Sequence, residues 1–187
     1  MQVLRLFVAF LLLGQAAQAQ GTDWSGLYGG AALDFTRVEM SPVDGASVSN
    51  EGNGLMIGAE GGYRYDLGQV VLGATASLMF GSVDVPPVIG NVPQDPVLNA
   101  LMTVGIEAGY DLGEVLVYGG IGHTWSTMRT IAGNRRFESG YQFGIGADYM
   151  LTDTIMVGGG ISRTVLDDFS GSDVQTTSFG VRAAYRF

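Results

Sequence analysis

Residues 54–65 read Gly-Leu-Met-Ile-Gly-Ala-Glu-Gly-Gly-Tyr-Arg-Tyr, and this stretch decides the fold. Its odd positions are apolar or aromatic apart from one glycine. Its even positions hold glycines, one methionine and both charges, Glu60 and Arg64. Successive side chains point to opposite faces in a β-strand. The stretch therefore predicts a strand with one apolar face and one polar, glycine-rich face.

Seven further segments of the chain alternate with the same period. We expect strands at residues 24–36, 55–65, 70–81, 98–111, 115–127, 137–150, 155–165 and 176–187. Three connections are short and polar, at residues 66–69, 111–114 and 151–154, and the others are longer, at residues 37–53, 82–97, 128–136 and 166–175. Short turns at one end and long loops at the other are typical of outer-membrane β-barrels.

The apolar faces of these strands carry almost no charge, and they have aromatic residues at both ends. Tyr63, Tyr65, Tyr110, Tyr149, Tyr185 and Phe187 lie near the short turns, and Phe35, Phe80 and Trp125 lie near the long loops. Two aromatic belts around an aliphatic band are typical of a lipid-facing surface, whereas a soluble barrel has its apolar face inside. The sequence therefore predicts an all-β protein, an eight-stranded antiparallel transmembrane β-barrel with short periplasmic turns and longer extracellular loops. A soluble periplasmic barrel is the less favoured alternative.

The composition excludes several other classes of protein. The chain has 187 residues, with 30 glycines, no cysteine, one histidine and 14% charged residues, against about 25% charged residues in average usage. Without cysteines there is no disulfide scaffold, and one histidine cannot supply the usual zinc site. The net charge of −9 argues against binding to nucleic acid, which requires a basic surface.

The N-terminal segment has the features of a secretory signal peptide. Arg5 precedes a continuous apolar run at residues 6–13, and Ala17-Gln18-Ala19 supplies the small residues that a signal peptidase reads. The run is too short for a transmembrane helix, which needs about 20 apolar residues. We expect residues 1–19 to be a signal peptide cleaved after Ala19, and residues 20–187 to form the barrel domain.

Both ends of the expected barrel resemble a known family. Residues 24–30, Trp-Ser-Gly-Leu-Tyr-Gly-Gly, resemble the opening strand of the small outer-membrane β-barrels that include opacity-type surface proteins and the transmembrane domain of OmpA. The alternating C-terminal residues resemble the signal read by the barrel-assembly machinery: Phe179, Val181, Ala183, Tyr185 and Phe187. The resemblance implies the outer membrane of a Gram-negative bacterium and an assembly role for Tyr185 and Phe187. Because the sequence stops at Phe187, we expect no peptidoglycan-binding domain of the OmpA type.

The polar faces of the strands place charges inside the expected barrel. Three acids and three arginines are the members of a predicted lumen charge network: Glu60, Glu107, Asp148, Arg64, Arg182 and Arg186. We interpret this network as structural, because unpaired buried charges are costly and an eight-stranded interior is just wide enough for side chains to fill it. A gated ion path or proton relay is the alternative. Inward-facing glycines favour water-filled pockets: Gly30, Gly58, Gly62, Gly73, Gly105, Gly120, Gly122, Gly144, Gly146, Gly158, Gly160 and Gly180.

The residues that could support an enzyme or a metal site have unsuitable spacings. Some small outer-membrane barrels are lipid A deacylases with a histidine and a serine two residues apart on one strand face. Here the spacing of His123 and Ser126 places them on opposite faces, so we predict no enzyme. Asp167, Asp168 and Asp173 could approach a divalent cation, but their spacing matches no defined loop, and we predict neither a metal nor a cofactor.

Several arginines lie near the long-loop end of the barrel. Arg129, Arg135, Arg136 and Arg163, together with Arg37, are candidates for contact with lipopolysaccharide phosphates, which arginine binds in bidentate fashion. The expected partners are outer-membrane lipid, lipopolysaccharide and the barrel-assembly machinery, and the barrel is expected to be a monomer. The sequence thus predicts a non-enzymatic structural and surface protein that supports membrane integrity and loop-mediated interaction. A narrow channel for small solutes is the second hypothesis, and a lipid A-modifying enzyme the third.

Overall fold

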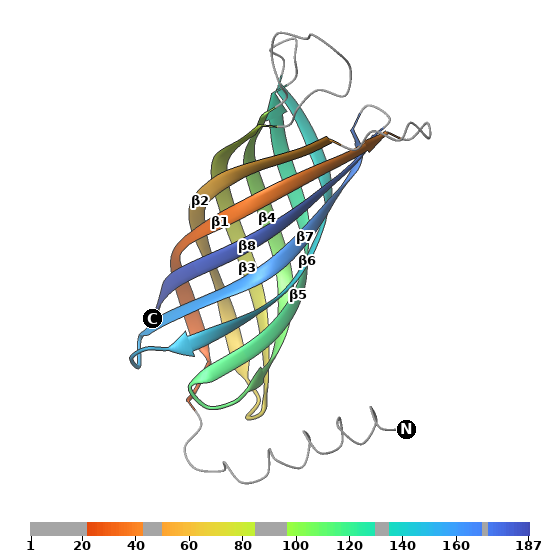
Figure 1. The fold of residues 1–187 in the computed structure, drawn as a ribbon. Helices are drawn as coiled ribbons and strands as arrows, with labels where there is room; N and C mark the ends of the chain where they lie inside the picture. Colours follow the sequence, from red (N-terminus) through yellow and green to blue (C-terminus); the bar gives the residue numbers. More distant parts are fainter. Residues whose placement is uncertain (1–21, 43–49, 85–96, 130–134, 170–171) are drawn as a thin grey trace, which may run out of the picture.

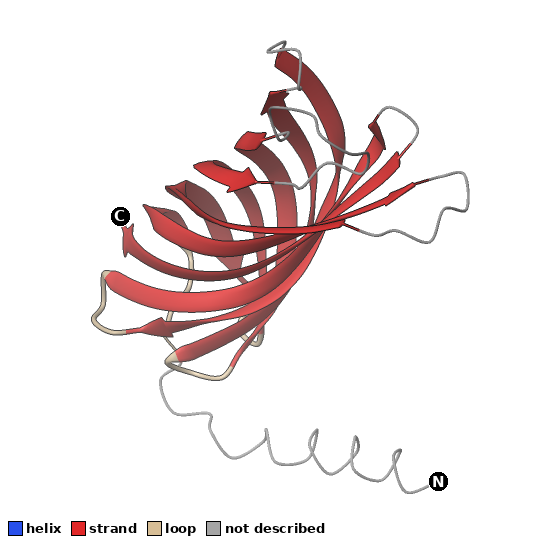
Figure 2. Cartoon of the chain, turned by 45° about the horizontal axis from the view of Figure 1, so that its top comes forward, coloured by secondary structure: helices blue, strands red, loops and turns tan. Residues whose placement is uncertain are grey.

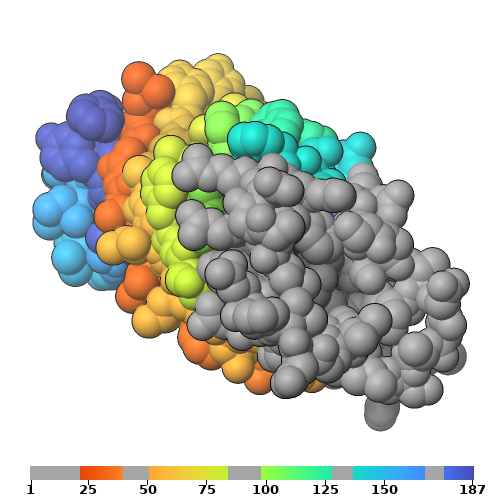
Figure 3. Space-filling view, turned by 90° about the horizontal axis from the view of Figure 1, so that it is seen from above, coloured from red at the N-terminus to blue at the C-terminus, as the bar shows by residue number. Residues whose placement is uncertain are grey.

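The chain forms a single closed barrel of antiparallel strands (Figure 1). The computed structural model describes residues 22–42, 50–84, 97–129, 135–169 and 172–187. Its strands are β1 (Gly26–Pro42), β2 (Asn50–Asp66), β3 (Val70–Asp84), β4 (Val97–Asp111), β5 (Val115–Arg129), β6 (Arg135–Met150), β7 (Ile155–Phe169) and β8 (Ser172–Arg186). Each strand pairs with its neighbour in sequence, and β8 closes the barrel on β1, beside which it lies in the wall (Figure 3). The predicted eight-stranded antiparallel barrel is confirmed.

The stagger between the strands sets the tilt of the barrel wall. A path that starts at Gly29 on β1 and follows paired residues through every strand returns to β1 at Glu39. The stagger is this offset along β1, from position 29 to position 39, after one circuit of the barrel. With ordinary strand spacing and rise, this stagger corresponds to a strand tilt of about 40°. A strand of 15 residues then rises about 38 Å along the barrel axis, whereas the apolar band of such barrels is about 25 Å tall. The wall therefore continues well beyond the lipid-facing band.

The strands are longer than the alternation of the sequence indicates. The segment 166–175, expected to be a loop, is mostly strand, because β7 continues to Phe169 and β8 begins at Ser172. Likewise β1 continues to Pro42 and β2 begins at Asn50. Beyond the apolar band the outward residues become polar, as at Arg37 and Asn53, while inward ones such as Val38 can be apolar, so the apolar-outward alternation ends although the backbone ladder continues. At its other end β1 starts at Gly26 rather than at Trp24.

Glycines with positive φ close two of the short turns. Gly68 (φ 105°) and Gly113 (φ 92°) each follow an Asp-Leu pair. The carboxylate two residues earlier accepts a hydrogen bond from the glycine N–H, at 2.7 Å from Asp66 to Gly68 and 2.6 Å from Asp111 to Gly113. These Asx-type turns explain the repeated Asp-Leu-Gly motif. The short turns lie together at one end of the barrel, called the short-turn end below (Figure 2).

The outer surface of the barrel carries the predicted apolar residues. Their side chains are exposed on all eight strands, for example Ile57 (64%), Ile106 (65%) and Ile145 (69%). The aromatic residues expected at the two ends of the band are exposed as well: Tyr63, Tyr65, Tyr110, Tyr149, Tyr185, Phe187, Phe35, Phe80 and Trp125. In the expected strand 98–111, Leu98 has the same parity as Met102 and Val104 and was expected to face outward with them; this assignment is wrong, because Leu98 is fully buried. The register of β4 shifts between Leu98 and Ala100, and such a bulge moves the side chains beyond it to the other face.

Two apolar clusters fill the inside of the barrel. One lies near the short-turn end and consists of Trp24, Tyr28, Val71, Leu116, Met150, Met156 and Ala184. The other, the upper cluster, lies toward the opposite end and consists of Ala32, Val38, Met56, Met79, Val83, Leu98, Leu101 and Leu166. The inside is thus apolar at two levels, and polar side chains lie between them.

Among the described residues, no helix is long and apolar enough to cross a membrane.

Candidate functional site

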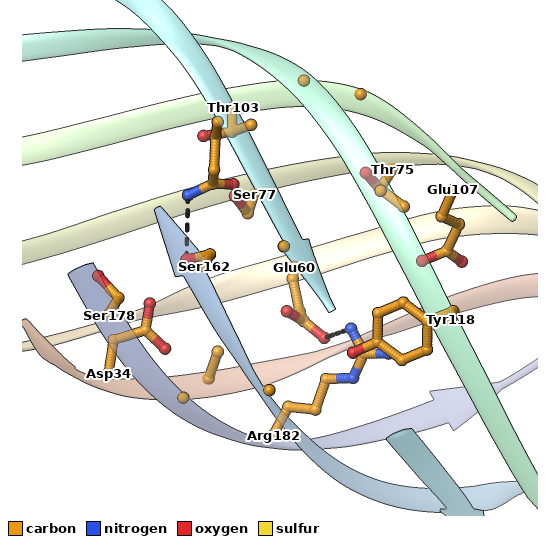
Figure 4. A pocket seen from close by; sticks show the side chains of 18 of the residues that line it. Asp34, Glu60, Thr75, Ser77, Thr103, Glu107, Tyr118, Ser162, Ser178 and Arg182 are labelled. Carbon is orange, nitrogen blue, oxygen red and sulfur yellow. Dashed lines mark hydrogen bonds and ion pairs between the residues drawn. The ribbon is translucent and has the colours of Figure 1, made fainter. Parts of the chain in front are cut away.

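Five charged side chains form a continuous network inside the barrel. Arg64 Nε donates to Glu107 Oε1 at 2.6 Å, and Arg64 Nη2 lies 2.8 Å from Asp148 Oδ2. Arg182 donates to both oxygens of Asp148, at 2.7 Å for Nε to Oδ1, and its Nη1 lies 2.9 Å from Glu60 Oε1 (Figure 4). The order is therefore Glu107, Arg64, Asp148, Arg182, Glu60, with Asp148 shared by both arginines.

The network is buried, and its contacts differ in solvent exposure and in hydrogen-bond geometry. The side chains of Arg64 and Asp148 are almost inaccessible, whereas those of Arg182 and Glu60 are slightly exposed. Arg64 Nη2 and Glu60 Oε1 have no aligned hydrogen-bond partner among the described residues, so their two contacts are charge contacts only. Removing one partner of a buried ion pair typically costs about 3–5 kcal/mol, because the other charge stays buried. The network is thus a strong constraint on the barrel.

Glycines on intervening strands allow oppositely charged side chains to come into contact. Arg64 on β2 and Glu107 on β4 are both paired in register with Gly73 on the strand between them. A Cβ atom at Gly73 would lie 2.9 Å from the Glu107 side chain. The two charges therefore reach each other across β3 because position 73 has no side chain.

The same arrangement recurs on the opposite wall. Asp148 on β6 and Arg182 on β8 both pair with Gly158 on β7, and a Cβ at Gly158 would overlap the Asp148 carboxylate. Each ion pair thus spans two strand spacings over a glycine, and the contact of Arg64 with Asp148 joins the two pairs across the lumen. This pairing explains the glycines at positions 73 and 158 on the polar strand faces.

Aromatic rings surround the two arginines. The Arg64 guanidinium carbon lies 4.7 Å from the ring centroid of Tyr28 and 5.4 Å from that of Tyr118. The guanidinium carbon of Arg182 lies 4.8 Å from the Tyr118 ring. Cation–π contacts of this kind stabilise a desolvated arginine. Tyr28 in turn lies against Gly62, where a Cβ would be 3.0 Å from the ring.

Arg186 does not join the network, so its assignment there is wrong. Its guanidinium donates to the carbonyl oxygen of Asp153 at 2.7 Å, in an exposed position. Arg186 is the last residue of β8, and it therefore lies nearer to the turn at residues 151–154 than to the buried acids of the network.

The C-terminal residues with the expected assembly role lie on the outside of the barrel. Tyr185 and Phe187 pack edge to face, with ring centroids 5.1 Å apart. The Phe187 N–H donates to the Leu27 carbonyl at 2.9 Å. The last residue is thereby fastened to the first strand, and its ring remains exposed.

Trp24 closes the short-turn end, a role that the strand pattern did not indicate. Its indole N–H lies 3.2 Å from both Asp111 Oδ1 and the Gly113 carbonyl, and its backbone N–H donates to Asp66 Oδ2 at 3.1 Å. The ring is 1% exposed and lies 5.8 Å from the Arg64 guanidinium carbon. Two sequence features could have predicted this role: a tryptophan directly before the first strand, and aspartates at the start of two short turns.

The neighbouring residues hold this segment in place. Ser25 N–H donates to Asp23 Oδ1 at 2.8 Å, and this hydrogen bond is the main reason why the pKa of the Asp23 carboxyl lies below its usual value. The Ser25 hydroxyl accepts a hydrogen bond from the Asp66 N–H at 3.1 Å. The residues before β1 are thus bonded to Asp66, the last residue of β2, where the first short turn begins.

A polar cavity of about 180 Å³ lies beside the network (Figure 4). It is lined by inward glycines and by polar side chains that include Asp34, Glu60, Ser77, Thr103, Ser162 and Arg182. Among the described residues, Asp34 makes no hydrogen bond or ion pair. A cavity with this volume and lining is large enough to hold several waters.

Hydroxyl groups continue from the cavity toward the upper cluster. Thr36 and Ser178 are hydrogen-bonded at 3.0 Å, and Thr103 and Thr124 at 2.9 Å. Thr176 is fully buried, and its hydroxyl has no partner among the described residues. The lumen is therefore polar over part of its upper half.

His123 and Ser126 lie on opposite faces of β5. His123 packs outward, with its ring 4.6 Å from that of Trp125 and 5.4 Å from that of Tyr141. Ser126 is buried, and its hydroxyl donates to the Glu138 carbonyl at 3.3 Å. A nucleophile and its base must come within hydrogen-bond reach, and these two residues do not.

The described residues contain no group of three or more His, Cys, Asp or Glu that could hold a metal ion. The side chains of Asp167, Asp168 and Asp173 lie outside the described residues.

The arginines expected near the long connections occupy two regions of the barrel. Arg129 and Arg135 are paired in register at the far end of β5 and β6, and Arg136 is paired with Met128; the side chains of these residues lie outside the description. Arg37 and Arg163 are exposed on the outer surface, and Arg163 donates to the Gln175 side chain.

Comparison with known proteins gives one family and several similar folds. Residues 6–187 match the family described as outer membrane protein beta-barrel domain. The structure is similar to that of Ail, the attachment invasion locus protein of Yersinia pestis, with 15% identity over 87% of this chain and 99% of that one and a TM-score of 0.53. Neisserial surface protein A is similar over 87% of this chain and 98% of that one, with 16% identity and a TM-score of 0.52. OprG from Pseudomonas aeruginosa is similar over 91% and 99%, with 14% identity and a TM-score of 0.50. No curated protein sequence matches.

Proposed function

Because the chain belongs to the outer membrane protein beta-barrel domain family, we propose that it is a non-enzymatic outer-membrane protein with a structural and surface role. One observation carries this proposal: the interior holds a chain of paired charges and two buried apolar clusters, while the outer surface is apolar. An interior filled in this way supports the wall of the barrel and favours a structural role over transport through a wide pore.

The surface part of the role concerns the end opposite the short turns. By the usual orientation of such barrels this end is extracellular. At the far end of β5 and β6 the backbone places Arg129 opposite Arg135, next to Arg136. We propose that these arginines contact lipopolysaccharide phosphates, since arginine suits bidentate contact with phosphate. The connections at this end would then meet partners outside the cell.

A pair of epitope insertions tests the surface part. An epitope placed between Arg129 and Arg135 should bind antibody on intact cells. The same epitope placed after Leu112, in a short turn, is the matched control, and it should bind antibody only after the outer membrane is opened. Labelling of both insertions, or of neither, on intact cells would contradict the proposed orientation.

A test in cells addresses the structural part. Cells that lack the chain should take up more of a hydrophobic dye and become more sensitive to detergent, and the wild-type chain should restore both. A variant that assembles but has lost the network, such as Arg64→Met, should restore them less. Unchanged permeability in cells without the chain would refute the role in membrane integrity.

A narrow channel for small solutes is the second candidate, and the polar cavity favours it. The charged residues that line the cavity are three acids, Asp34, Glu60 and Glu107, and one arginine, Arg182, so a path through it would prefer cations. Single-channel recordings in planar bilayers test this function. The channel hypothesis expects conductance that disappears in a Glu60→Gln/Arg182→Gln double variant. The structural hypothesis expects none in either protein.

Processing and assembly complete the proposal. Cleavage after Ala19 would release the barrel domain, and N-terminal sequencing of the protein from membranes tests the position. The assembly machinery would read Tyr185 and Phe187, so Phe187→Ala should lower the amount of assembled barrel while the purified variant still folds in detergent. The barrel is proposed to be a monomer, which light scattering in detergent can check.

A further inference from the structure

On one side of the barrel, the outer surface changes abruptly from apolar to polar. Residues paired in register across neighbouring strands form a rung. One outward-facing rung is apolar and exposed over four strands: Leu55, Phe35, Phe179 and Ile161. The next outward rung, two residues further from the short turns, is polar: Asn53, Arg37, Thr177 and Arg163. The lipid-facing band therefore ends between these two rungs, and both arginines belong to its boundary.

The height of Arg37 agrees with such a boundary. Leu27 pairs with Tyr63, which belongs to the aromatic belt near the short turns. From position 27 to position 37, β1 rises about 25 Å at the tilt set by the stagger. The apolar band of outer-membrane barrels is also about 25 Å tall. Arg37 therefore lies at the level of the lipid head groups at the extracellular end.

Arg163 reaches the same level with its side chain. Because of the tilt, its Cα lies about 6 Å nearer the membrane centre than that of Arg37. Its guanidinium donates to the side chain of Gln175, and Gln175 pairs with Val165, on the next outward rung. The side chain thus extends toward the outer boundary, as arginines near a bilayer interface do.

The two arginines flank a single small residue. Arg37 on β1 and Arg163 on β7 both pair with Thr177 on β8, so their Cα atoms are about 10 Å apart, two strand spacings. Both side chains are exposed. Among the described residues Arg37 makes no ion pair, and the hydrogen bond of Arg163 to Gln175 uses one of its five N–H donors.

We propose that Arg37 and Arg163 together bind the phosphate of a lipid head group in the outer leaflet, above Thr177. The proposal rests on the outer-membrane role proposed above and adds a defined lipid site to it. Guanidinium groups suit this ligand because they are permanently charged and pair with phosphate oxygens in bidentate geometry. The apolar rung beneath them, with Phe35 and Phe179, would contact the first part of the acyl chains.

The site can be tested with the full barrel in phosphatidylcholine nanodiscs doped with lipid A. Native mass spectrometry would count the lipid A molecules retained by the wild type, by Arg37→Gln, by Arg163→Gln and by the double variant. Arg186→Gln is the matched control, since it removes a partly exposed arginine at the opposite end of the barrel. A second arm uses lipid A from which the phosphates have been removed enzymatically. A heat-dependent shift in gel mobility shows that each variant is a closed barrel.

We expect each single substitution to weaken lipid A retention about tenfold, the usual effect of one charge-assisted hydrogen-bonded contact, and the control to retain it fully. Lipid A without phosphates should bind the wild type no better than it binds the double variant. Equal retention by the wild type and the double variant, or equal retention of both lipids, would overturn the site. Such a result would leave the proposed function intact, because the permeability and epitope experiments test that function independently of lipid A binding.

Discussion

Asp148→Asn tests the interior of the barrel most directly. Asp148 accepts charged contacts from Arg64 and Arg182 and is inaccessible to solvent. Asparagine keeps the shape of the side chain but removes its charge, so two buried arginines are left with one acidic partner each, Glu107 and Glu60. We expect the free energy of unfolding to fall by about 3–5 kcal/mol, the range for breaking a buried ion pair.

Urea titration of the barrel folded in phospholipid vesicles gives the magnitude. Trp24 and Trp125 report unfolding by fluorescence, since one is buried inside and the other faces lipid. With a denaturant slope of about 1–3 kcal/mol per molar urea, the midpoint should fall by roughly 2 M. Glu114→Gln is the control, because this carboxylate contacts only the exposed Tyr149 hydroxyl among the described residues, and its midpoint should barely move.

A double-mutant cycle sharpens the test. The Asp148→Asn/Arg182→Met variant should be less destabilised than the sum of the single variants, because removing the second partner eliminates an unpaired buried charge. A loss below about 1 kcal/mol for Asp148→Asn, as for an exposed pair, would refute the claim that this network stabilises the wall. Additive single effects would refute the coupling within it.

Other changes probe the remaining features of the barrel. Gly158→Ala should destabilise the barrel by about 1–3 kcal/mol, because its Cβ would overlap the Asp148 carboxylate; Gly119→Ala, whose Cβ would meet its nearest atom at 3.7 Å, should leave the urea midpoint unchanged. Trp24→Phe removes the indole N–H bonded at the short-turn end and should cost about 1 kcal/mol in the same titration; an unchanged midpoint would argue against the closing role of Trp24. Ile106→Arg places a charge in the lipid-facing band and should cost about 2–4 kcal/mol in vesicles, and a smaller loss would mean that position 106 lies outside the hydrocarbon. Asp34→Asn should lower the cation preference of any conductance measured in planar bilayers, because Asp34 lines the cavity; unchanged selectivity would exclude Asp34 from the path.

The alternation of side chains predicted the orientation of most of the wall. Leu55, Ile57 and Tyr63 were assigned outward and are exposed, whereas Glu60 and Arg64 were assigned inward and are largely buried. The prediction of orientation was correct at these positions because every second side chain of a membrane-spanning strand faces the hydrocarbon. The prediction was wrong at Leu98, because a bulge depends on the register of the neighbouring strands as well as on the residue itself.

The candidate site was predictable as a set of charges but not as a set of contacts. The sequence places Glu60, Arg64, Glu107, Asp148, Arg182 and Arg186 on inward faces, and it contains no information on the height of one strand against another. The stagger of the barrel brings Arg64 and Glu107 together over Gly73. The same stagger leaves Arg186 beside the carbonyl of Asp153.

The sequence by itself determined the strand period, the two faces of the wall and the positions of the short turns, because these depend on residues close together in the chain. Only the tertiary structure decided that Trp24 closes one end, that Asp148 is shared between two arginines and that Arg37 and Arg163 flank Thr177. Each of these arrangements brings together residues that are far apart in sequence, such as Trp24 and Asp111 or Arg37 and Arg163. Their meeting depends on closure of the barrel at a particular stagger, and that is a property of all eight strands together.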